Sequence, residues 1–582
     1  MQSNGVMDTD LSNLTLDDLM KHGIANLADE TKEHGYIVRH GLTPVSEFGR
    51  NRTDHEENPS KINPLAGAYP TLFPYGVGLI EGGQQVKIGF EEHVRWVLQY
   101  HDRRFRKHRS FPFVVFGIQQ KRDALTSARI QMRRRDFQRD AMLLTSLTFD
   151  DLREAEREEA NNQIITNSRV SVLHRHVFAT ASHVKGSNQS RANYRSQIWG
   201  TCLTKGGPSL WITINPSDTH DPVAQIFAGC DIDMDQFSAH LGPNNDQRAR
   251  NMANDPYASA QYFFFIIEAV LRCLFQVSVT KYRVHSGNGV LGRISAYFGV
   301  VEAQGRGALH VHMLLWLEDT PNTDEVHELL QTEEFREKLK NYIRQNIRAH
   351  FDGINAETIP TIPKESALPY SRPPNPDSER WEAECADIER RVVRSQQVHV
   401  CSNTTCLRFD QYGKKSCKRR APFQEAEDDF VELNGEWGPK RTCAMINNYC
   451  PTITVNLRCN NGIKLITNGS DTKDIAWYST DYETKPQGKN YNVSALMAKA
   501  LLYHEQHCEK YKDHLDRNRM LLFRCQSAMN REMELSGPQV MAYLMGWNDT
   551  FCSHHYVPLY WSSMKARLME ANPDLCQRMR DR

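Results

Sequence analysis

Two histidines separated by one apolar residue are the residues of this sequence whose types and spacing point most directly to chemistry. His310 and His312 lie in the apolar run 308–317, which glycine and acidic residues bound, and such a run is typical of a buried β-strand. Side chains two residues apart on a strand point to the same face. The two imidazoles can therefore bind one divalent metal if a third ligand joins them. The alternative is a pair of hydrogen-bonded core histidines.

The third ligand has two candidates just before the histidines. Glu302 and Gln304 share the parity of His310 and His312, so either side chain faces the same way if the strand continues backward without a bulge. The sequence alone does not choose between them.

A second stretch offers two phenols and an ammonium group on one helix face. Residues 470–486 begin with N-cap residue types and end at Pro486, which leaves room for about three helical turns. Tyr478, Tyr482 and Lys485 follow one another at spacings of four and three residues, so they lie within roughly 60° of one another around a helix. The alternative is that these tyrosines belong to an amphipathic core stripe.

Together, the two stretches contain the residue types needed to transfer a phosphodiester bond from DNA to a tyrosine. A tyrosine hydroxyl is a weak nucleophile because its pKa is about 10, and a metal that polarises a phosphodiester oxygen lowers the barrier to its attack. A nearby lysine stabilises the phenolate or the charge that develops around phosphorus. The product is a covalent phosphotyrosine that retains the bond energy for rejoining. Two tyrosines permit two such transfers in turn.

The motifs His-hydrophobic-His and Tyr-x3-Tyr-x2-Lys resemble the HUH replication-initiator nuclease of Helitron rolling-circle transposases. Further stretches are similar to the same family: GPSLWITINPSD at 207–218, EAQGRG at 302–307, ELSGPQVMAYLMGW at 534–547, SHH at 553–555 and LYW at 559–561. The resemblance runs from roughly residue 65 to the end of the sequence.

The resemblance implies a Rep-type endonuclease and DNA strand transferase that acts on single-stranded DNA at transposon ends, in DNA transposition and recombination. It implies Mg²⁺ or Mn²⁺ as the catalytic metal, and an oxygen ligand suits these hard ions better than histidines alone. Tyr482 is expected to attack first because it heads the Tyr-x2-Lys element, with Tyr478 second and Lys485 assisting. For a eukaryotic protein, the resemblance implies a nuclear location.

Two other functions remain open at this point. The chain can be a catalytically inactive or domesticated single-stranded DNA-binding module of a truncated transposon, or a metal phosphodiesterase that uses water and keeps its tyrosines in the core. Helitron transposases also resemble fusions of the nuclease to an ATP-driven helicase. No Gly-x4-Gly-Lys-Ser/Thr motif occurs in the 582 residues, so we expect the helicase module elsewhere in cis or in trans.

The amino-acid composition excludes a net positive charge over the whole protein. The chain has 71 basic and 71 acidic residues and a formal net charge of zero, so a DNA site must be a local patch. The sequence shows no secretory h-region or apolar run of membrane-spanning length, and we expect no membrane partner. Fourteen cysteines in so long a chain indicate free thiols or metal ligands rather than a disulfide scaffold.

Basic residues mixed with aromatic and small polar residues mark candidate DNA contacts before and within the nuclease. Such mixtures suit single-stranded DNA, where phosphates pair with cations and bases stack, although a solvated helix face is the alternative. The stretch 185–195 is the best candidate because its Gly, Asn and Ser residues add hydrogen-bond donors for phosphate. The expected DNA-binding residues are Lys185, Arg191, Arg195, Arg133, Arg134 and Arg306.

A cysteine cluster suggests a second metal site. His399, Cys401, Cys406 and Cys417 have the residue types of a structural Zn²⁺ site, without the tight Cys-x2-Cys spacing. Scattered buried thiols are the alternative.

The predicted fold class is α+β, with an antiparallel-sheet HUH nuclease core, a helical N-terminal region and an all-α C-terminal extension. We expect several strands with helices packed on one side. The predicted regions are a disordered or loose leader (1–63), a helical N-terminal DNA-binding region (64–200), the HUH Rep-type nuclease domain (201–490) with a Cys-rich insertion at about 385–460, and a helical extension (491–582) that leads toward the helicase module.

Overall fold

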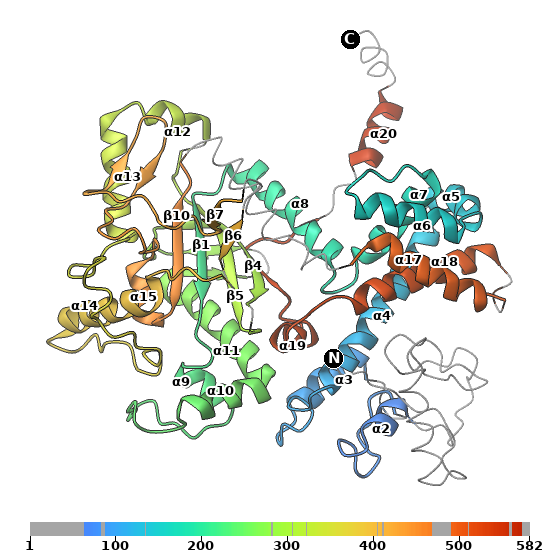
Figure 1. The fold of residues 1–582 in the computed structure, drawn as a ribbon, viewed down its shortest axis with the longest axis horizontal. Helices are drawn as coiled ribbons and strands as arrows, with labels where there is room; N and C mark the ends of the chain where they lie inside the picture. The colour runs from blue at the N-terminus through green and yellow to red at the C-terminus, as the bar shows by residue number, and fades with distance from the viewer. Residues whose placement is uncertain are drawn as a thin grey trace.

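The computed structural model describes most of the chain from Asn63 to Asn572 (Figure 1). The described ranges are 63–82, 86, 88–133, 135–280, 283–304, 306–321, 323–403, 406–409, 413–467, 491–509, 511, 513–557 and 561–572. The predicted leader lies outside them except for Asn63, whose side chain accepts hydrogen bonds from the backbone of Leu65 and Ala66 and begins α2 (Pro64–Ala68).

A five-stranded antiparallel sheet in the order β10-β1-β5-β4-β11 is the centre of the fold. Its strands are β1 (Leu210–Asn215), β4 (Ile294–Ala303), β5 (Leu309–Leu317), β10 (Asn460–Leu465) and β11 (Thr550–Cys552). β4 and β5 form a hairpin, closed by hydrogen bonds from the Gln304 N–H to the Ala308 carbonyl (2.8 Å) and from the Gly307 N–H to the Gln304 carbonyl (2.7 Å). Gly307 has φ +91°, a conformation that favours glycine.

Helices cover both faces of this sheet, so the expectation of helices on one side only is wrong. On one face, Ile212, Val311 and Met313 pack into the large core that includes α11 (Pro256–Ala269) and its π-helical continuation η3 (Val270–Leu274). On the other, Phe298 and Leu314 join a second core with Ile198 of α8 (Asn188–Lys205). The reason is that β5 is apolar at almost every position, and a continuous apolar strand must be buried on both sides.

The segment Pro256–Leu274 is, among the described residues, the one helix long and apolar enough to cross a membrane by length and composition. Within its most apolar window, 56% of the residues are buried inside the molecule. It packs against β5 and α19 (Gly537–Met545). Its apolar character is accounted for by its position as the helix that covers the sheet.

The predicted all-α C-terminal extension is wrong because β11 joins the sheet. Thr550, Phe551 and Cys552 pair with Val300, Gly299 and Phe298 of β4 and complete the edge of the sheet. β-branched and aromatic residues fit this half-buried position. The C-terminal region therefore supplies one strand to the central sheet.

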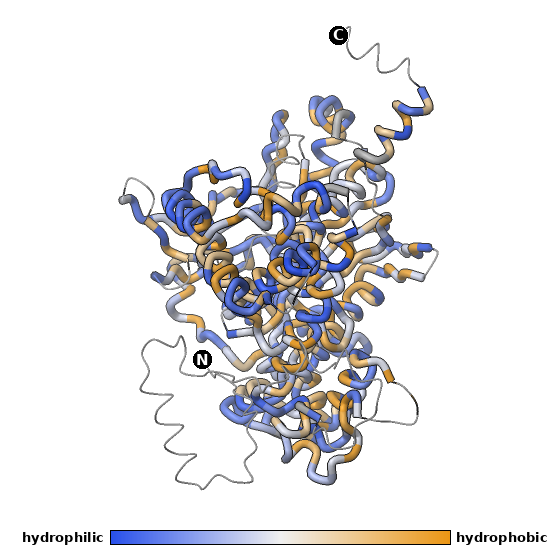
Figure 2. Tube along the Cα trace, turned by 90° about the vertical axis from the view of Figure 1, so that its right-hand side faces the viewer, coloured by the Kyte–Doolittle hydropathy of each residue, from blue (hydrophilic) through white to orange (hydrophobic). Residues whose placement is uncertain are grey.

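A helical bundle lies beside the sheet and draws its helices from both ends of the chain (Figure 1). It contains α4 (Phe111–Met132), α5 (Arg135–Thr145), α6 (Phe149–Ala160), α7 (Ser168–Ala181), α17 (Val493–Gln506) and α18 (His514–Arg531). Leu152 and Leu173 share one core with Met497 and Leu522. The Glu159 carboxylate accepts the first N–H groups of α17 at 3.0 and 2.9 Å, which stabilises the positive end of that helix. Figure 2 shows hydrophobic and hydrophilic residues interleaved along the described part of the chain.

The remaining elements lie outside the central sheet and the bundle. The helices are α3 (Phe90–Leu98), α9 (Pro222–Phe227), α10 (Asn245–Asn254), α12 (Thr323–Leu329), α13 (Glu333–Asn346), α14 (Trp381–Val392), η4 (Val393–Gln397), α15 (Pro451–Leu457) and α20 (Trp561–Ala571). The strands pair as hairpins: β2 (Val277–Val279) with β3 (Val284–Ser286), β6 (Leu407–Phe409) with β7 (Lys415–Cys417), and β8 (Phe430–Val431) with β9 (Trp437–Gly438).

Candidate metal centre on the central sheet

The two histidines of β5 lie together on the face that α8 covers. The Nε2 atoms of His310 and His312 are 3.1 Å apart, as the alternation of a strand requires. Both side chains are buried, at 11% and 8% exposure. The arrangement directs two ring nitrogens to one point inside the protein.

Glu302 supplies a carboxylate at the same point. It lies directly opposite His310 in the β4–β5 ladder, and its Oε2 is 3.7 Å from His310 Nε2 and 3.9 Å from His312 Nε2. The three ligand atoms lie within 4.8 Å of one another. Gln304 lies beyond the end of β4, in the turn to β5. Strand pairing therefore makes Glu302 the oxygen ligand that fits the histidine pair.

Burial keeps both histidines in the form that binds metal. Loss of solvent around the rings lowers the pKa of His310 to about 4, and the same cause lowers the pKa of His312 to about 3, with a further contribution from His310. Neutral imidazole presents a lone pair, whereas imidazolium does not. Two neutral imidazole nitrogens and one carboxylate oxygen are a donor set that divalent ions accept.

Neighbouring strand β1 fixes the orientation of His312. The Oγ1 atom of Thr213 is 2.8 Å from His312 Nδ1, and the indole of Trp211 stacks on the imidazole with ring centroids 5.6 Å apart. Lys464 of β10 places its Nζ 4.9 Å from the centroid of Trp211. The second ring nitrogen of a metal-binding histidine commonly makes such a hydrogen bond, which fixes the tautomer. The sequence motif 207–218 was identified, but these contacts depend on the pairing of β1 with β5.

Arg191 is a buried neighbour of the site rather than an exposed DNA contact. Its side chain is 3% exposed, and its Nη2 lies 3.7 Å from Glu302 Oε1. Burial opposes the charge of the guanidinium, but Asp549, Tyr543 and Glu302 outweigh burial and raise the pKa of Arg191. A permanent cation thus lies behind the carboxylate. The predicted surface role of Arg191 does not fit this position, because the packing of α8 turns the residue inward.

The other expected DNA-binding residues are dispersed. Lys185 pairs with both carboxylate oxygens of Glu91 at 3.1 Å, and Arg195 is half-buried on α8. Arg133 is exposed at the end of α4, and Arg134 lies outside the described residues. Arg306 is exposed in the β4–β5 turn, with its Nη2 3.8 Å from Asp218 Oδ1. Arg306 is therefore an exposed cation in the turn that joins the strands carrying the metal ligands.

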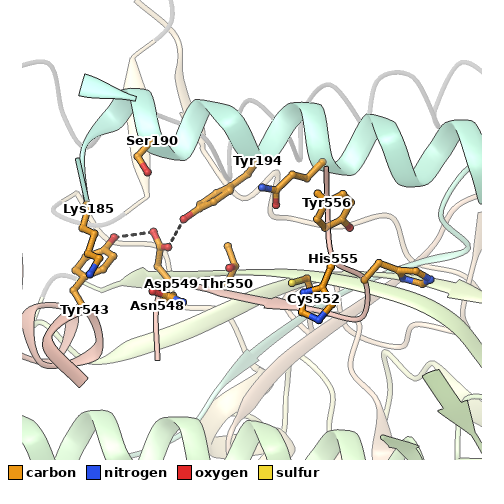
Figure 3. A pocket seen from close by; sticks show the side chains of 13 residues that line it. Lys185, Ser190, Tyr194, Tyr543, Asn548, Asp549, Thr550, Cys552, His555 and Tyr556 are labelled. Atoms are coloured by element: carbon orange, nitrogen blue, oxygen red, sulfur yellow. Dashed lines mark hydrogen bonds between the residues drawn. The ribbon is translucent and has the colours of Figure 1, made fainter. Parts of the chain in front are cut away.

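A shallow cavity of about 300 Å³ lies between α8 and the β11 region (Figure 3). Inside it, the hydroxyls of Tyr194 and Tyr543 both donate hydrogen bonds to the carboxylate of Asp549, the second at 2.7 Å. Burial and the negative charge of Asp549 hold the pKa of both phenols well above the usual value. Sequence reasoning missed this network, although segment 534–547 belongs to the stretches that carry the family resemblance.

The candidate nucleophiles Tyr478 and Tyr482, with Lys485, lie outside the described residues. The last residue described before them is Thr467, whose Oγ1 donates to the Gly435 carbonyl at 2.5 Å. The first residue described after them is Tyr491, which packs against the bundle core. β10, a strand of the same sheet, ends at Leu465, five residues before the predicted helix 470–486 begins. The second candidate metal group, His399, Cys401, Cys406 and Cys417, is assembled with all four ligand atoms within 4.8 Å of one another.

Residues 93–315 match the family described as the Helitron helicase-like domain at the N-terminus. The match includes β1, β4 and β5 through Leu315, and therefore all three ligands of the candidate metal centre. Over this range the chain is similar to the Helitron helicase-like domain, and the similarity suggests a transposon-associated role. The comparison with curated proteins found no match.

Proposed function

We propose that this protein is an HUH-type nuclease of the Helitron transposase kind, which nicks and joins single-stranded DNA through covalent phosphotyrosine. The observation that carries the proposal is the group formed by Glu302, His310 and His312 on two adjacent central strands. The match over residues 93–315 supports it, because the matched range contains this group.

The protein's contribution to the metal centre is a preorganised donor set. Nε2 of His310, Nε2 of His312 and a carboxylate oxygen of Glu302 would hold Mg²⁺ or Mn²⁺. A bound ion would withdraw charge from a phosphodiester oxygen and so favour attack on phosphorus. Thr213 and Trp211 hold His312 in place. The Nη2 atom of Arg191 lies 3.7 Å from the other carboxylate oxygen of Glu302.

Tyr482 and Tyr478 are the proposed nucleophiles. The phenol oxygen of one tyrosine forms a bond to phosphorus, the phosphodiester bond breaks, and the departing DNA oxygen leaves with a proton as a hydroxyl. Lys485 stabilises the attacking phenolate or the charge around phosphorus. Because the number of phosphoester bonds is unchanged, a DNA hydroxyl can reverse the step and rejoin a strand.

The proposed partners are single-stranded DNA at transposon ends and a helicase that supplies unwinding, in cis or in trans. A nuclear location follows if the source is eukaryotic. Exposed cations near the sheet, Arg306 among them, would contact phosphates, since such contacts need no sequence readout.

A denaturing gel separates this proposal from its competitors. Labelled single-stranded oligonucleotide is incubated with the protein and Mn²⁺, and half of each sample is treated with protease. A protease-sensitive DNA–protein adduct supports the proposal. Cleavage without an adduct supports a water-dependent phosphodiesterase, and intact DNA bound in a native gel supports an inactive binding module.

Two variants with matched controls assign the residues. His312→Ala should abolish metal-dependent adduct formation and leave DNA binding, whereas His240→Ala, which changes an exposed histidine, should leave both. Replacing Tyr478 and Tyr482 by Phe should abolish the adduct and retain Mn²⁺ binding. Tyr75→Phe, at a side chain that is 87% exposed, is the control. An adduct in the double Phe variant would contradict the assignment of the nucleophiles.

A further inference from the structure

A compact group of three thiols and one imidazole lies outside the candidate metal centre. His399 Nε2 is 3.5 Å from Cys406 Sγ and 3.3 Å from Cys417 Sγ, and Cys401 completes a group whose ligand atoms lie within 4.8 Å of one another. In a tetrahedral site, Zn–S bonds of about 2.3 Å and Zn–N bonds of about 2.0–2.1 Å place N and S about 3.6 Å apart. The observed N–S distances fit that geometry closely.

Backbone hydrogen bonds around the group fix the position of the Cys406 sulfur. Ser402 donates its N–H to Cys406 Sγ at 3.3 Å, and the Cys406 and Leu407 N–H groups both donate to the Ser402 carbonyl. The β6–β7 hairpin then brings Cys417 opposite Leu407, next to Cys406. N–H hydrogen bonds to sulfur are the outer contacts that orient and stabilise thiolate ligands.

The local apolar core is too small to explain this hairpin. β6 and β7 have three residues each, and Phe409 is 72% exposed. Lys415 and Ser416 of β7 are also exposed. A two-stranded ribbon of this size is marginal in water and ordinarily needs a disulfide or a structural metal. His399, Cys401, Cys406 and Cys417 are side chains that can bind such a structural metal.

The residues that follow Cys417 are basic and lie near the sheet. Lys418, Arg419 and Arg420 are all exposed, and the Arg420 N–H donates to the Cys417 carbonyl at 2.8 Å. Asn460 at the start of β10 donates a hydrogen bond to the Gln396 carbonyl at 2.6 Å, three residues before His399. The group of thiols and the basic residues that follow it are therefore tied to the segment that packs on the edge strand of the sheet.

We propose that His399, Cys401, Cys406 and Cys417 bind a structural zinc ion, which holds the β6–β7 hairpin and positions the exposed Arg419 after it for contact with DNA phosphate. The zinc site stands independently of the nuclease. The DNA contact rests on the proposed function, because it assumes that single-stranded DNA reaches the histidine face.

Metal analysis of the full chain tests the zinc site. Wild-type protein purified without chelator should contain about one zinc per chain, and a mercurial reagent should release it while the protein is still folded. Cobalt exchanged into the site should show thiolate-to-cobalt charge-transfer absorption. Cys406→Ser and Cys417→Ser should lose the zinc, whereas Cys273→Ser, at an exposed free thiol, should retain it. Wild-type protein that takes up neither zinc nor cobalt would overturn the proposal.

The salt dependence of single-stranded DNA binding tests the phosphate contact of Arg419. Arg419→Ala should keep its zinc but lower the slope of log affinity against log salt by about 0.7 for single-stranded DNA, the value of one lost phosphate contact. The matched control is Arg250→Ala, at an exposed arginine on α10, which should leave that slope at the wild-type value. An unchanged slope in Arg419→Ala would overturn the DNA contact and leave the zinc site standing. Absence of a covalent adduct in the nicking assay would refute the nuclease without affecting the zinc result.

Discussion

Replacing Thr213 by Val tests whether the sheet fixes His312 for metal binding. The substitution keeps the β-branched shape that suits a strand and removes the hydroxyl that lies 2.8 Å from His312 Nδ1. Metal binding through Nε2 leaves the ring proton on Nδ1, and Thr213 Oγ1 is the acceptor placed for it. Without that acceptor, the proton is buried in a side chain that is 8% exposed, where water cannot easily replace the hydroxyl.

The expected loss of affinity follows from that burial. An unsatisfied buried donor costs about 1–3 kcal/mol, and loss of an outer-shell partner commonly lowers metal affinity about 10–100-fold. These ranges agree, because a factor of ten corresponds to about 1.4 kcal/mol. Isothermal titration with Mn²⁺ measures the change directly.

Thr204→Val is the matched control for this measurement. Thr204 is exposed on α8, and its hydroxyl donates only within that helix. Its affinity for Mn²⁺ should equal that of the wild type. Wild-type affinity in Thr213→Val, with folding intact by circular dichroism, would refute the idea that Thr213 orients a metal ligand.

Three further predictions concern the site and the bundle. Glu302→Gln should lower Mn²⁺ affinity because it removes the only carboxylate of the three ligands. Glu159→Gln should lower the free energy of unfolding by about 1 kcal/mol, seen as a lower Tm, since it weakens the cap of α17. Burial, with the charges of Arg524 and Arg517, lowers the pKa of His504 to about 4. Its neutral form therefore contributes stability above pH ~6.5 that is lost as pH falls toward 4, and His504→Gln should flatten this part of a urea-unfolding pH profile.

Each of these predictions has its own check. For Glu302→Gln, unchanged Mn²⁺ affinity would remove Glu302 from the ligand set. For Glu159→Gln, the control is Glu154→Gln at an exposed position of the same helix, and equal Tm values for the two variants would refute the cap. For His504→Gln, a pH profile parallel to that of the wild type between 4 and 6.5 would assign the acid sensitivity to other groups.

The alternation of side chains along a strand was sufficient to predict the two histidines of the candidate metal centre. The uninterrupted apolar run around His310 and His312 gave the strand, and the alternation of side chains gave their common face. Parity also placed Glu302 among the candidates, but Gln304 stayed open because the position of the turn decides between them. That turn depends on hydrogen bonds between Gln304, Gly307 and Ala308, which the pattern of apolar residues does not encode.

Contacts between elements far apart in sequence were not predictable from pattern. Arg191 belongs to a basic, polar stretch, and only the packing of α8 on the sheet shows that it is buried beside Glu302. Thr213 acquires its contact from the pairing of β1 with β5. Thr550 and its neighbours are too short a run to be recognised as a strand until β4 presents an open edge. The role of Tyr478 and Tyr482 stays a prediction.

The shared bundle core has a consequence for the order of folding during synthesis. Helices α4 to α7 emerge from the ribosome well before α17 and α18, and the whole sheet up to β10 is made in between. Contacts of such long sequence separation form late and slow folding, so Leu152 and Leu173 await partners that are translated more than 300 residues later. During that interval the N-terminal helices expose apolar surface, the condition in which chains engage chaperones or aggregate. Truncated chains that stop before α18 should therefore be poorly soluble even when the metal ligands are all present.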